Sequence, residues 1–181
     1  MSAMVKVVLT ALGQDRPGLV SALSEVVSDH QGNWLTSEMA RLAGSFAGIV
    51  LVEVPENQLE DLKSSVRRLG DEGLLEVSLA LADPVVPGSG EVIRMGLHLL
   101  GQDRPGIVRE ITRALAAHGV TILEFSSDIG EAPQAGGRLF RAEAALQVPA
   151  IVTEEQVRSS LEGLAAELMV DLTLEGPEIS Q

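Results

Sequence analysis

The hexapeptide Gly-Gln-Asp-Arg-Pro-Gly occupies Gly13–Gly18 and recurs without change at Gly101–Gly106, 88 residues further along a chain of 181 residues. The match continues beyond the hexapeptide in one register, because Gly13–Leu35 aligns with Gly101–Leu123 at the same offset. It resumes after six additional residues in the second copy, around Gly130–Gly137. A repeat that holds its register over this length indicates a duplicated structural unit.

The repeat and the length of the chain together predict two domains. We expect a first unit at residues 1–82, a linker at residues 83–90 and a second unit at residues 91–181. The linker reads Asp-Pro-Val-Val-Pro-Gly-Ser-Gly, and its prolines and glycines are typical of a connecting loop. Units of this size lie near the lower limit for a domain with its own hydrophobic core.

Alternation of apolar and polar residues predicts the strands, and apolar spacing of three and four residues predicts the helices. In the first unit we expect a strand at 4–12, a helix after the hexapeptide, strands at 33–42 and 45–54, a helix at 56–69 and a strand at 74–81. The second unit has the same pattern, with a strand around 93–99, a helix after its hexapeptide, strands at 121–129 and 138–148, a helix at 153–168 and a strand at 169–175.

The order β-α-β-β-α-β predicts an α+β protein made of two ferredoxin-like units in tandem. In that fold a four-stranded antiparallel sheet carries two helices on one face. Its first and third strands are central, and its second strand lies at an edge.

The net charge of −13 indicates which classes of partner the chain does not bind. Residues 1–90 carry 6 basic and 12 acidic side chains, residues 91–181 carry 7 and 14, and no run of Lys or Arg occurs in either half. Proteins that bind DNA directly use cations to displace the counterions of the phosphates. We therefore expect no direct contact with nucleic acid and no binding to anionic membrane surfaces.

Other features of the composition favour a cytoplasmic protein. The chain has no cysteine, which fits a reducing compartment. It shows no signal peptide, and no apolar run approaches the roughly 20 residues needed to span a bilayer. With three Phe, one Trp and no Tyr, it also lacks the aromatic platforms on which single-stranded nucleic acids stack.

The hexapeptide joins a central strand to a helix, and its chemistry suits an anion. Asp15 can cap the helix, and Pro17 fits a first helical turn. Gly13 and Gly18 let the backbone approach another group closely. Helix-start N–H groups and the helix dipole favour a carboxylate in such a loop. Two interpretations stay open, since Asp15 either caps the helix or receives a ligand ammonium group while Arg16 pairs with a carboxylate.

The unit order, the unit size and Asp-Arg-Pro-Gly at the first strand–helix loop resemble the ACT domain family of small-molecule regulatory modules. Two such units with nothing else attached resemble the glycine cleavage system transcriptional repressor group. The resemblance implies binding of a small amino acid, glycine being one candidate, between this loop and an edge strand of a neighbouring unit, and hence a homo-oligomer. It points to these ligand-binding residues: Gln14, Asp15, Arg16, Gly18, Gln102, Asp103, Arg104 and Gly106.

The resemblance also implies how such a protein acts. The repressor group works through a DNA-binding transcription factor, which fits a chain too acidic to bind DNA itself. The first alternative is a ligand-sensing regulatory subunit of a metabolic enzyme. The second is a small enzyme on a ferredoxin-like scaffold, since fold alone does not decide function.

No catalytic, metal or cofactor motif supports an enzyme. The sequence contains no Gly-x-Ser-x-Gly, no phosphate-binding loop and no metalloprotease motif. His30 and His118 match across the two copies, which would suit a metal pair, but no third ligand lies at the right spacing. A histidine near a helix C-terminus is favoured by the helix dipole, so we expect both to be structural.

The sheet faces turned away from the helices are expected to differ between units. In the first unit this face should be apolar, with Val8, Trp34, Ile49 and Leu51, and we expect another unit or a second chain to cover it. In the second unit the matching positions are small, polar or charged, and cross-strand charge pairs should keep the face solvated. They are Gly96, Ile122, Glu143 and Ala145, with Arg94, Glu124, Asp128 and Arg141 nearby.

The charge distribution yields a first prediction: the purified protein does not bind DNA without a partner. Its negative potential repels phosphates, and it has no cationic cluster to overcome that repulsion. A gel-shift titration at low salt checks this prediction and should show no retarded band. Salt-sensitive binding at micromolar protein, in the absence of any partner, would contradict it.

Overall fold

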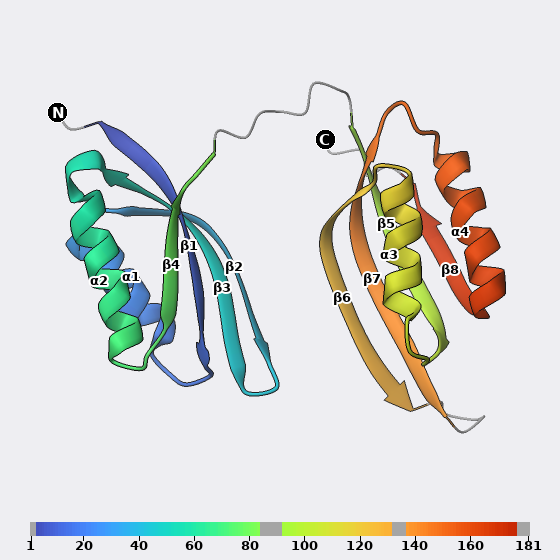
Figure 1. The fold of residues 1–181 in the computed structure, drawn as a ribbon, viewed down its shortest axis with the longest axis horizontal. Coiled ribbons are helices and arrows are strands. Elements are labelled where there is room, and N and C mark those ends of the chain that lie inside the picture. Colours follow the sequence, from blue (N-terminus) through green and yellow to red (C-terminus); the bar gives the residue numbers. More distant parts are fainter. Residues whose placement is uncertain (1–2, 84–91, 132–136, 177–181) are drawn as a thin grey trace. The chain divides into compact units, whose positions relative to one another are not determined.

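The computed structural model describes residues 3–83, 92–131 and 137–176. The chain divides into two compact units, Met1–Val85 and Val86–Gln181, which are described separately (Figure 1). Apart from Asp83, the linker expected at residues 83–90 lies outside the described residues. Most of the insertion that distinguishes the second copy, residues 132–136, also lies outside them.

The first unit has the expected topology. Its elements are β1 (Met4–Gln14), α1 (Leu19–Asp29), β2 (Asn33–Leu42), β3 (Ser45–Pro55), the short 3-10 helix η1 (Glu56–Gln58), α2 (Leu59–Asp71) and β4 (Glu76–Leu81). The four strands form an antiparallel sheet in the order β2-β3-β1-β4. The first and third strands are therefore central and β2 is an edge strand, as predicted.

The second unit repeats this topology. Its elements are β5 (Val92–Gln102), α3 (Ile107–Ala117), β6 (Thr121–Glu131), β7 (Arg138–Pro149), α4 (Glu154–Leu168) and β8 (Val170–Glu175). The strand order is β6-β7-β5-β8, again antiparallel throughout. Thr153 and Gln156 form a capping box at the start of α4, with Gln156 N donating to Thr153 Oγ1 at 3.2 Å.

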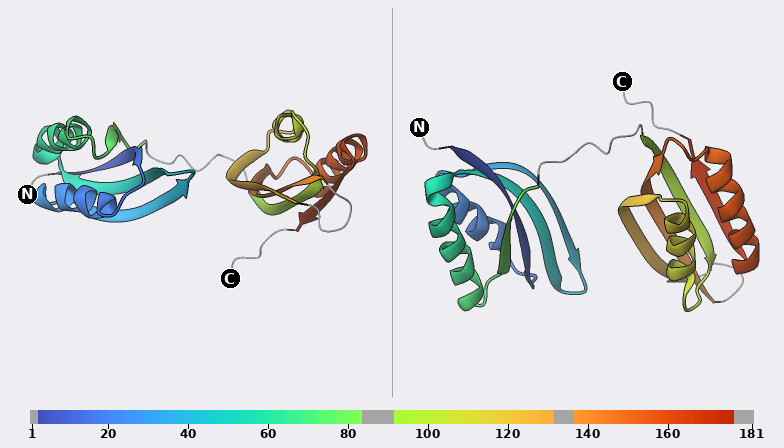
Figure 2. Two further views of the ribbon diagram at one scale, coloured as in Figure 1. Left: turned by 90° about the horizontal axis from the view of Figure 1, so that it is seen from below. Right: turned by 45° about the horizontal axis from the view of Figure 1, so that its top comes forward.

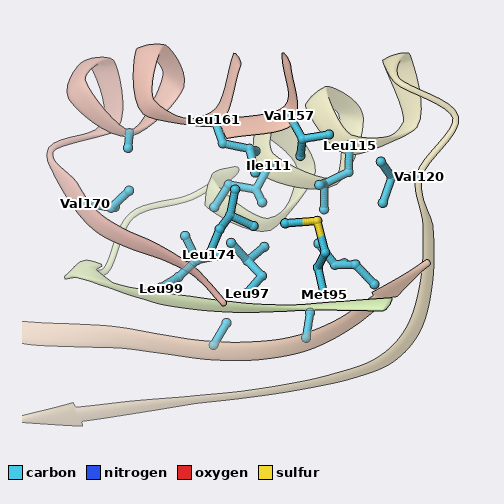
Figure 3. Packing of buried hydrophobic residues seen from close by; sticks show 14 of the residues in the cluster. Met95, Leu97, Leu99, Ile111, Leu115, Val120, Val157, Leu161, Val170 and Leu174 are labelled. Carbon is cyan, nitrogen blue, oxygen red and sulfur yellow. The ribbon is translucent and has the colours of Figure 1, made fainter. Parts of the chain in front are cut away.

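In each unit the helices lie on one face of the sheet (Figure 2). One hydrophobic core fills the space between the sheet and these helices. In the first unit, alternate residues of β1 (Val7, Leu9 and Ala11) are at most 1% exposed. In the second, Met95 and Leu97 of β5 lie beneath Ile111 of α3 and Leu161 of α4 (Figure 3). Each core is mainly aliphatic and includes one buried phenylalanine, Phe46 or Phe140. Alternate strand residues and one stripe of each helix supply it.

The first strand of each unit is longer than predicted and includes the first two residues of the hexapeptide. At these residues the strand passes very close to the chain that enters the last strand. A Cβ atom at Gly13 would lie 2.8 Å from the carbonyl oxygen of Leu74, and one at Gly101 would lie 2.4 Å from Cγ1 of Val170. The close approach expected at Gly13 is therefore to the unit's own backbone.

A β-bulge in each edge strand corrects the expected sheet faces. The pairing of β2 with β3 shifts between Trp34 and Thr36, and that of β6 with β7 shifts between Ile122 and Glu124. The extra residue reverses the alternation of side chains. Trp34 and Ile122 therefore pack against the cores, and their expected place on the open sheet faces is wrong.

The remaining open-face residues lie as expected. In the first unit, Ile49 is 54% exposed on the face turned away from the helices. In the second, Arg141 lies directly opposite Asp128, and its Nη2 donates to Oδ2 of that carboxylate at 2.8 Å. His98 Nδ1 lies 3.7 Å from Oε1 of Glu143, its partner in the register. One of the cross-strand charge pairs predicted for this face, that of Arg141 with Asp128, is thus present.

The close approach at Gly101 generates a prediction about stability. Gly101→Ala should lower the free energy of unfolding by about 1–3 kcal/mol, because the new methyl group overlaps Val170. Gly163→Ala is the matched control, since nothing lies within 4 Å of a Cβ there and the residue is inside α4. It should raise stability by roughly 0.5–1 kcal/mol. Chemical denaturation measures both, and an unaffected Gly101→Ala protein would contradict the steric argument.

Candidate functional site

The hexapeptide loop is fixed to the neighbouring hairpin in the same way in both units. The backbone N–H of Asp15 donates to the carbonyl of Gly44 at 2.9 Å, and that of Asp103 donates to the carbonyl of Arg138 at 2.8 Å. These carbonyls occupy equivalent places, one residue before the partners of Gln14 and Gln102 in the sheet. The identical hexapeptides thus adopt equivalent positions although the hairpins differ in length.

The helices begin at glycine, which corrects one of the two interpretations of the loop. Gly18 is the N-cap of α1 with φ 93°, Gly106 is the N-cap of α3 with φ 91°, and neither helix start has a side-chain cap. Only glycine adopts this left-handed conformation without strain. Asp15 lies three residues before Gly18 and does not cap the helix.

Each loop aspartate instead pairs with an arginine that sequence reasoning missed. Both Nε and Nη2 of Arg41 donate to Oδ2 of Asp15, with the Nε bond at 2.7 Å. In the second unit, Nε of Arg138 lies 3.5 Å from Oδ2 of Asp103. Arg41 comes from the end of β2 and Arg138 from the start of β7. Because the two arginines do not align in the repeat, the duplication gives no signal for them.

A cavity of about 370 Å³ lies beside the first loop. Its lining combines charged groups with an apolar wall: Asp15, Arg16, Pro17, Gly18, Leu19, Val20, Ser21, Arg41 and Phe46. Three of the four candidate residues of this unit therefore meet at one cavity. The first helical bond of α1 runs from Ala22 N to Gly18 O at 2.9 Å, so the N–H groups of residues 19–21 lack helical partners. These three residues lie on the cavity wall.

The fourth candidate, Gln14, lies elsewhere. It pairs with Ser45 at the end of the sheet, and it lines a different cavity of about 360 Å³ together with Leu12 and Glu76. Gln102 pairs with Leu139 at the equivalent place in the second unit. Both glutamines thus belong to the sheet, and in the first unit Gln14 lies outside the cavity that Asp15 and Gly18 line.

The two loop arginines have different partners. Nη2 of Arg16 donates to the carbonyl of Gly73, in the turn between α2 and β4. Nη2 of Arg104 donates to Oε2 of Glu110, in the first turn of α3, at 2.6 Å. The Nε of Arg104 is buried and has no hydrogen-bond partner within the described residues. The identical loops therefore present their guanidinium groups in two different environments.

His30 is structural, as expected. Its Nδ1 lies 2.7 Å from the carbonyl oxygen of Val26, and its Nε2 lies 3.2 Å from Oγ of Ser65. A carbonyl accepts only, so Nδ1 donates and the ring joins α1 to α2. Across the described ranges, no cluster of three or more His, Cys, Asp or Glu side chains is arranged to hold a metal ion.

Two further observations lie outside the loops. The pKa of Arg158 is raised above its ordinary value chiefly by its side-chain hydrogen bond with Glu154, one turn away in α4. This pair stabilises a helix and offers no proton for chemistry. None of the helices in the described part of the chain has the length and apolar character required to cross a membrane.

The fold and the loop define two βαββαβ units, each with a helix that starts at a left-handed glycine after its first strand. The sequence pattern of the ACT domain family matches residues 6–79 and 97–132, more than half of the chain. The chain belongs to the ACT domain family.

The chain covers different shares of the proteins to which it is similar. It is 26% identical to the glycine cleavage system transcriptional repressor of Escherichia coli, over 93% of this chain and 88% of that protein. It is 28% identical to phosphoserine phosphatase SerB2 of Mycobacterium tuberculosis, over 97% of this chain but only 42% of that protein. A crystal structure of an unknown protein from Galdieria sulphuraria is 29% identical, with a TM-score of 0.81 over 97% of this chain and 100% of that one.

The role of Asp15 can be measured by a double-mutant cycle with Arg41. Because the contact between them is an ion pair near the surface, Asp15→Ala should cost about 0.2–1 kcal/mol of stability in the parent protein. In an Arg41→Ala background the same substitution should cost nothing further, since the partner is already absent. A helix cap would give an equal cost, of about 0.5–2 kcal/mol, in both backgrounds. That result, from denaturant titrations of the four proteins, would contradict the assignment made here.

Proposed function

We propose that the protein is a non-enzymatic regulator that binds a small amino acid at the hexapeptide loop and acts by contact with a protein partner. The observation that carries the proposal is the cavity beside the first loop. It places Asp15, Arg16 and Arg41 around the start of α1. A volume of about 370 Å³ lies within the range of small-molecule sites.

The cavity offers complementary groups for both ends of a free amino acid. The carboxylate of the amino acid would accept hydrogen bonds from the guanidinium of Arg16 and from the N–H groups at the start of α1. Its ammonium group would donate to Asp15, whose Oδ2 already accepts from Arg41 and whose Oδ1 has no partner within the described ranges. The apolar wall of Val20 and Phe46 would suit a short side chain.

The partner we propose is a DNA-binding transcription factor. Similarity to the glycine cleavage system transcriptional repressor supports it, as does a net charge of −13 that disfavours direct DNA contact. The alternative is a regulatory subunit of a metabolic enzyme, supported by the similarity to part of a phosphoserine phosphatase. Co-purification with the tagged protein separates the two, because it recovers a DNA-binding protein in one case and an enzyme in the other.

The edge strands support a homo-oligomer. Nine of the ten residues of β2 are exposed, and this strand is hydrogen-bonded only to β3 within its unit. Its outer N–H and C=O groups are free to pair with another strand. We propose that such an edge strand, contributed by a neighbouring ACT unit, closes the cavity over a bound amino acid.

Thermal unfolding with each of the twenty amino acids tests the binding proposal. A ligand at 100 times its Kd stabilises the folded state by about 2.7 kcal/mol, so the Tm should rise by several degrees for at least one amino acid. Arg16→Ala should abolish the rise, because it removes the guanidinium that receives the carboxylate.

Arg67→Ala provides the control, since Arg67 is an exposed residue of α2 that does not line the cavity. It should leave the ligand-induced rise unchanged. If no amino acid raises the Tm of the parent protein at millimolar concentration, the loop is a structural helix start only and the proposed function is wrong.

A further inference from the structure

The two hexapeptide loops are identical in sequence but differ in what faces them. We propose that only the first loop accepts an amino acid. In the second loop the carboxylate of Glu110 already pairs with Arg104 and takes the place that the ligand carboxylate would need. This inference rests on the proposed function and specifies which unit performs it. The residue that decides is the fourth of each helix, which is Ala22 in α1 and Glu110 in α3.

The contact between Arg104 and Glu110 is the first observation. Nη2 of Arg104 lies 2.6 Å from Oε2 of Glu110, and the two side chains are only 37% and 31% exposed. A charge-assisted hydrogen bond of this length is the interaction that a ligand carboxylate would otherwise make. An incoming amino acid would have to displace Glu110 before it could pair with Arg104.

The first loop has no such competitor. Ala22 carries no charge, and Arg16 donates instead to the backbone carbonyl of Gly73. A carbonyl is a neutral acceptor, whereas a carboxylate adds the attraction between opposite charges to the hydrogen bond. Exchange of that carbonyl for a ligand carboxylate is therefore favourable at Arg16. The same exchange at Arg104 replaces one carboxylate with another.

The space beside the helix-start glycine is also more open in the first unit than in the second. Nothing lies within 4 Å of a Cβ atom built on Gly18, so the space beside α1 is open. At Gly106 the same position lies 3.6 Å from Nη2 of Arg109 and 3.6 Å from Oε1 of Glu110. These two side chains thus border the helix start of the second unit, where the first unit has no such neighbour within 4 Å.

Arg104 is also positioned to bind a carboxylate once Glu110 is removed. Its Nε is buried and, within the described residues, has no hydrogen-bond partner. Truncation of Glu110 leaves that donor and Nη2 without an acceptor, which is an unfavourable state for a partly buried guanidinium. A free carboxylate that enters the vacated space would satisfy both donors.

The test is an NMR titration of the full chain with a mixture of the twenty standard amino acids at millimolar concentration. The amide signals of Gly18 and Gly106 report on the two loops. In the parent protein the Gly18 signal should move and the Gly106 signal should not. In Glu110→Ala both signals should move, since the second loop is then open.

Substitutions at Ala22, the position of the first unit that matches Glu110, provide the reciprocal test. Ala22→Glu should abolish the response at Gly18, because it introduces the carboxylate that the second unit carries. Ala22→Gln is its matched control, with the same size but no charge, and it should retain the response. If Ala22→Glu does not fold, Glu110→Ala decides the question, since its substitution removes only side-chain atoms at a partly exposed position.

Movement of both signals in the parent protein, or movement of the Gly18 signal alone in both the parent protein and Glu110→Ala, overturns this inference and leaves the proposed function intact. Absence of any response at either loop, in the parent protein and in Glu110→Ala alike, overturns the proposed function and this inference with it.

Discussion

The close packing of the first strand of each unit against the chain that enters the last strand determines the rest of the site. The approach at Gly13 and Gly101 leaves no room for a side chain. It therefore constrains the central strand one residue before its end. The next fixed point is the left-handed glycine at the helix start, Gly18 or Gly106. Only four residues join these glycines, so the course of the loop is closely determined, and the backbone N–H of its aspartate meets the hairpin carbonyl in both units.

On this shared frame the two units have diverged through side chains outside the hexapeptide. The loop aspartate has an arginine partner in each unit, but Arg41 comes from the second strand and Arg138 from the third. An arginine thus pairs with the loop aspartate in both units, but the two arginines come from opposite strands of the hairpin. The loop arginine, by contrast, meets a backbone carbonyl in one unit and a carboxylate in the other. Identity of the motif therefore does not imply identity of the site.

The parts of the structure that depend on periodicity and on the repeat were predictable from the sequence. Strand and helix order, the central position of the first and third strands and the capping box at Thr153 follow from local pattern. The side of the sheet on which Trp34 lies was not predictable, because one bulged residue reverses the alternation and leaves no trace in the sequence. Asp15 was expected as a possible cap because Asp-x-Pro is a common helix start. The glycine three residues later takes that role instead.

Contacts between residues distant in the chain were also not predictable from the sequence. Arg41 lies 26 residues from Asp15, and no spacing rule connects the end of an edge strand to a loop that precedes it. Separation of Gln14 from the aspartate that follows it has a simpler origin. Gln14 is still part of the strand, so its pairing in the sheet sets its direction, whereas the aspartate already belongs to the loop.

The hydrogen bond from Arg16 to Gly73 gives the first unit a property that the second lacks. Four residues connect α2 to β4, and the loop guanidinium holds one carbonyl of that turn; only Met169 stands between α4 and β8. A change in the direction of Arg16 would release the turn at Gly73, and with it one anchor of an edge strand. The loop guanidinium thus links the helix start to the turn beside β4 in the first unit. In the second unit the loop arginine pairs with Glu110 instead.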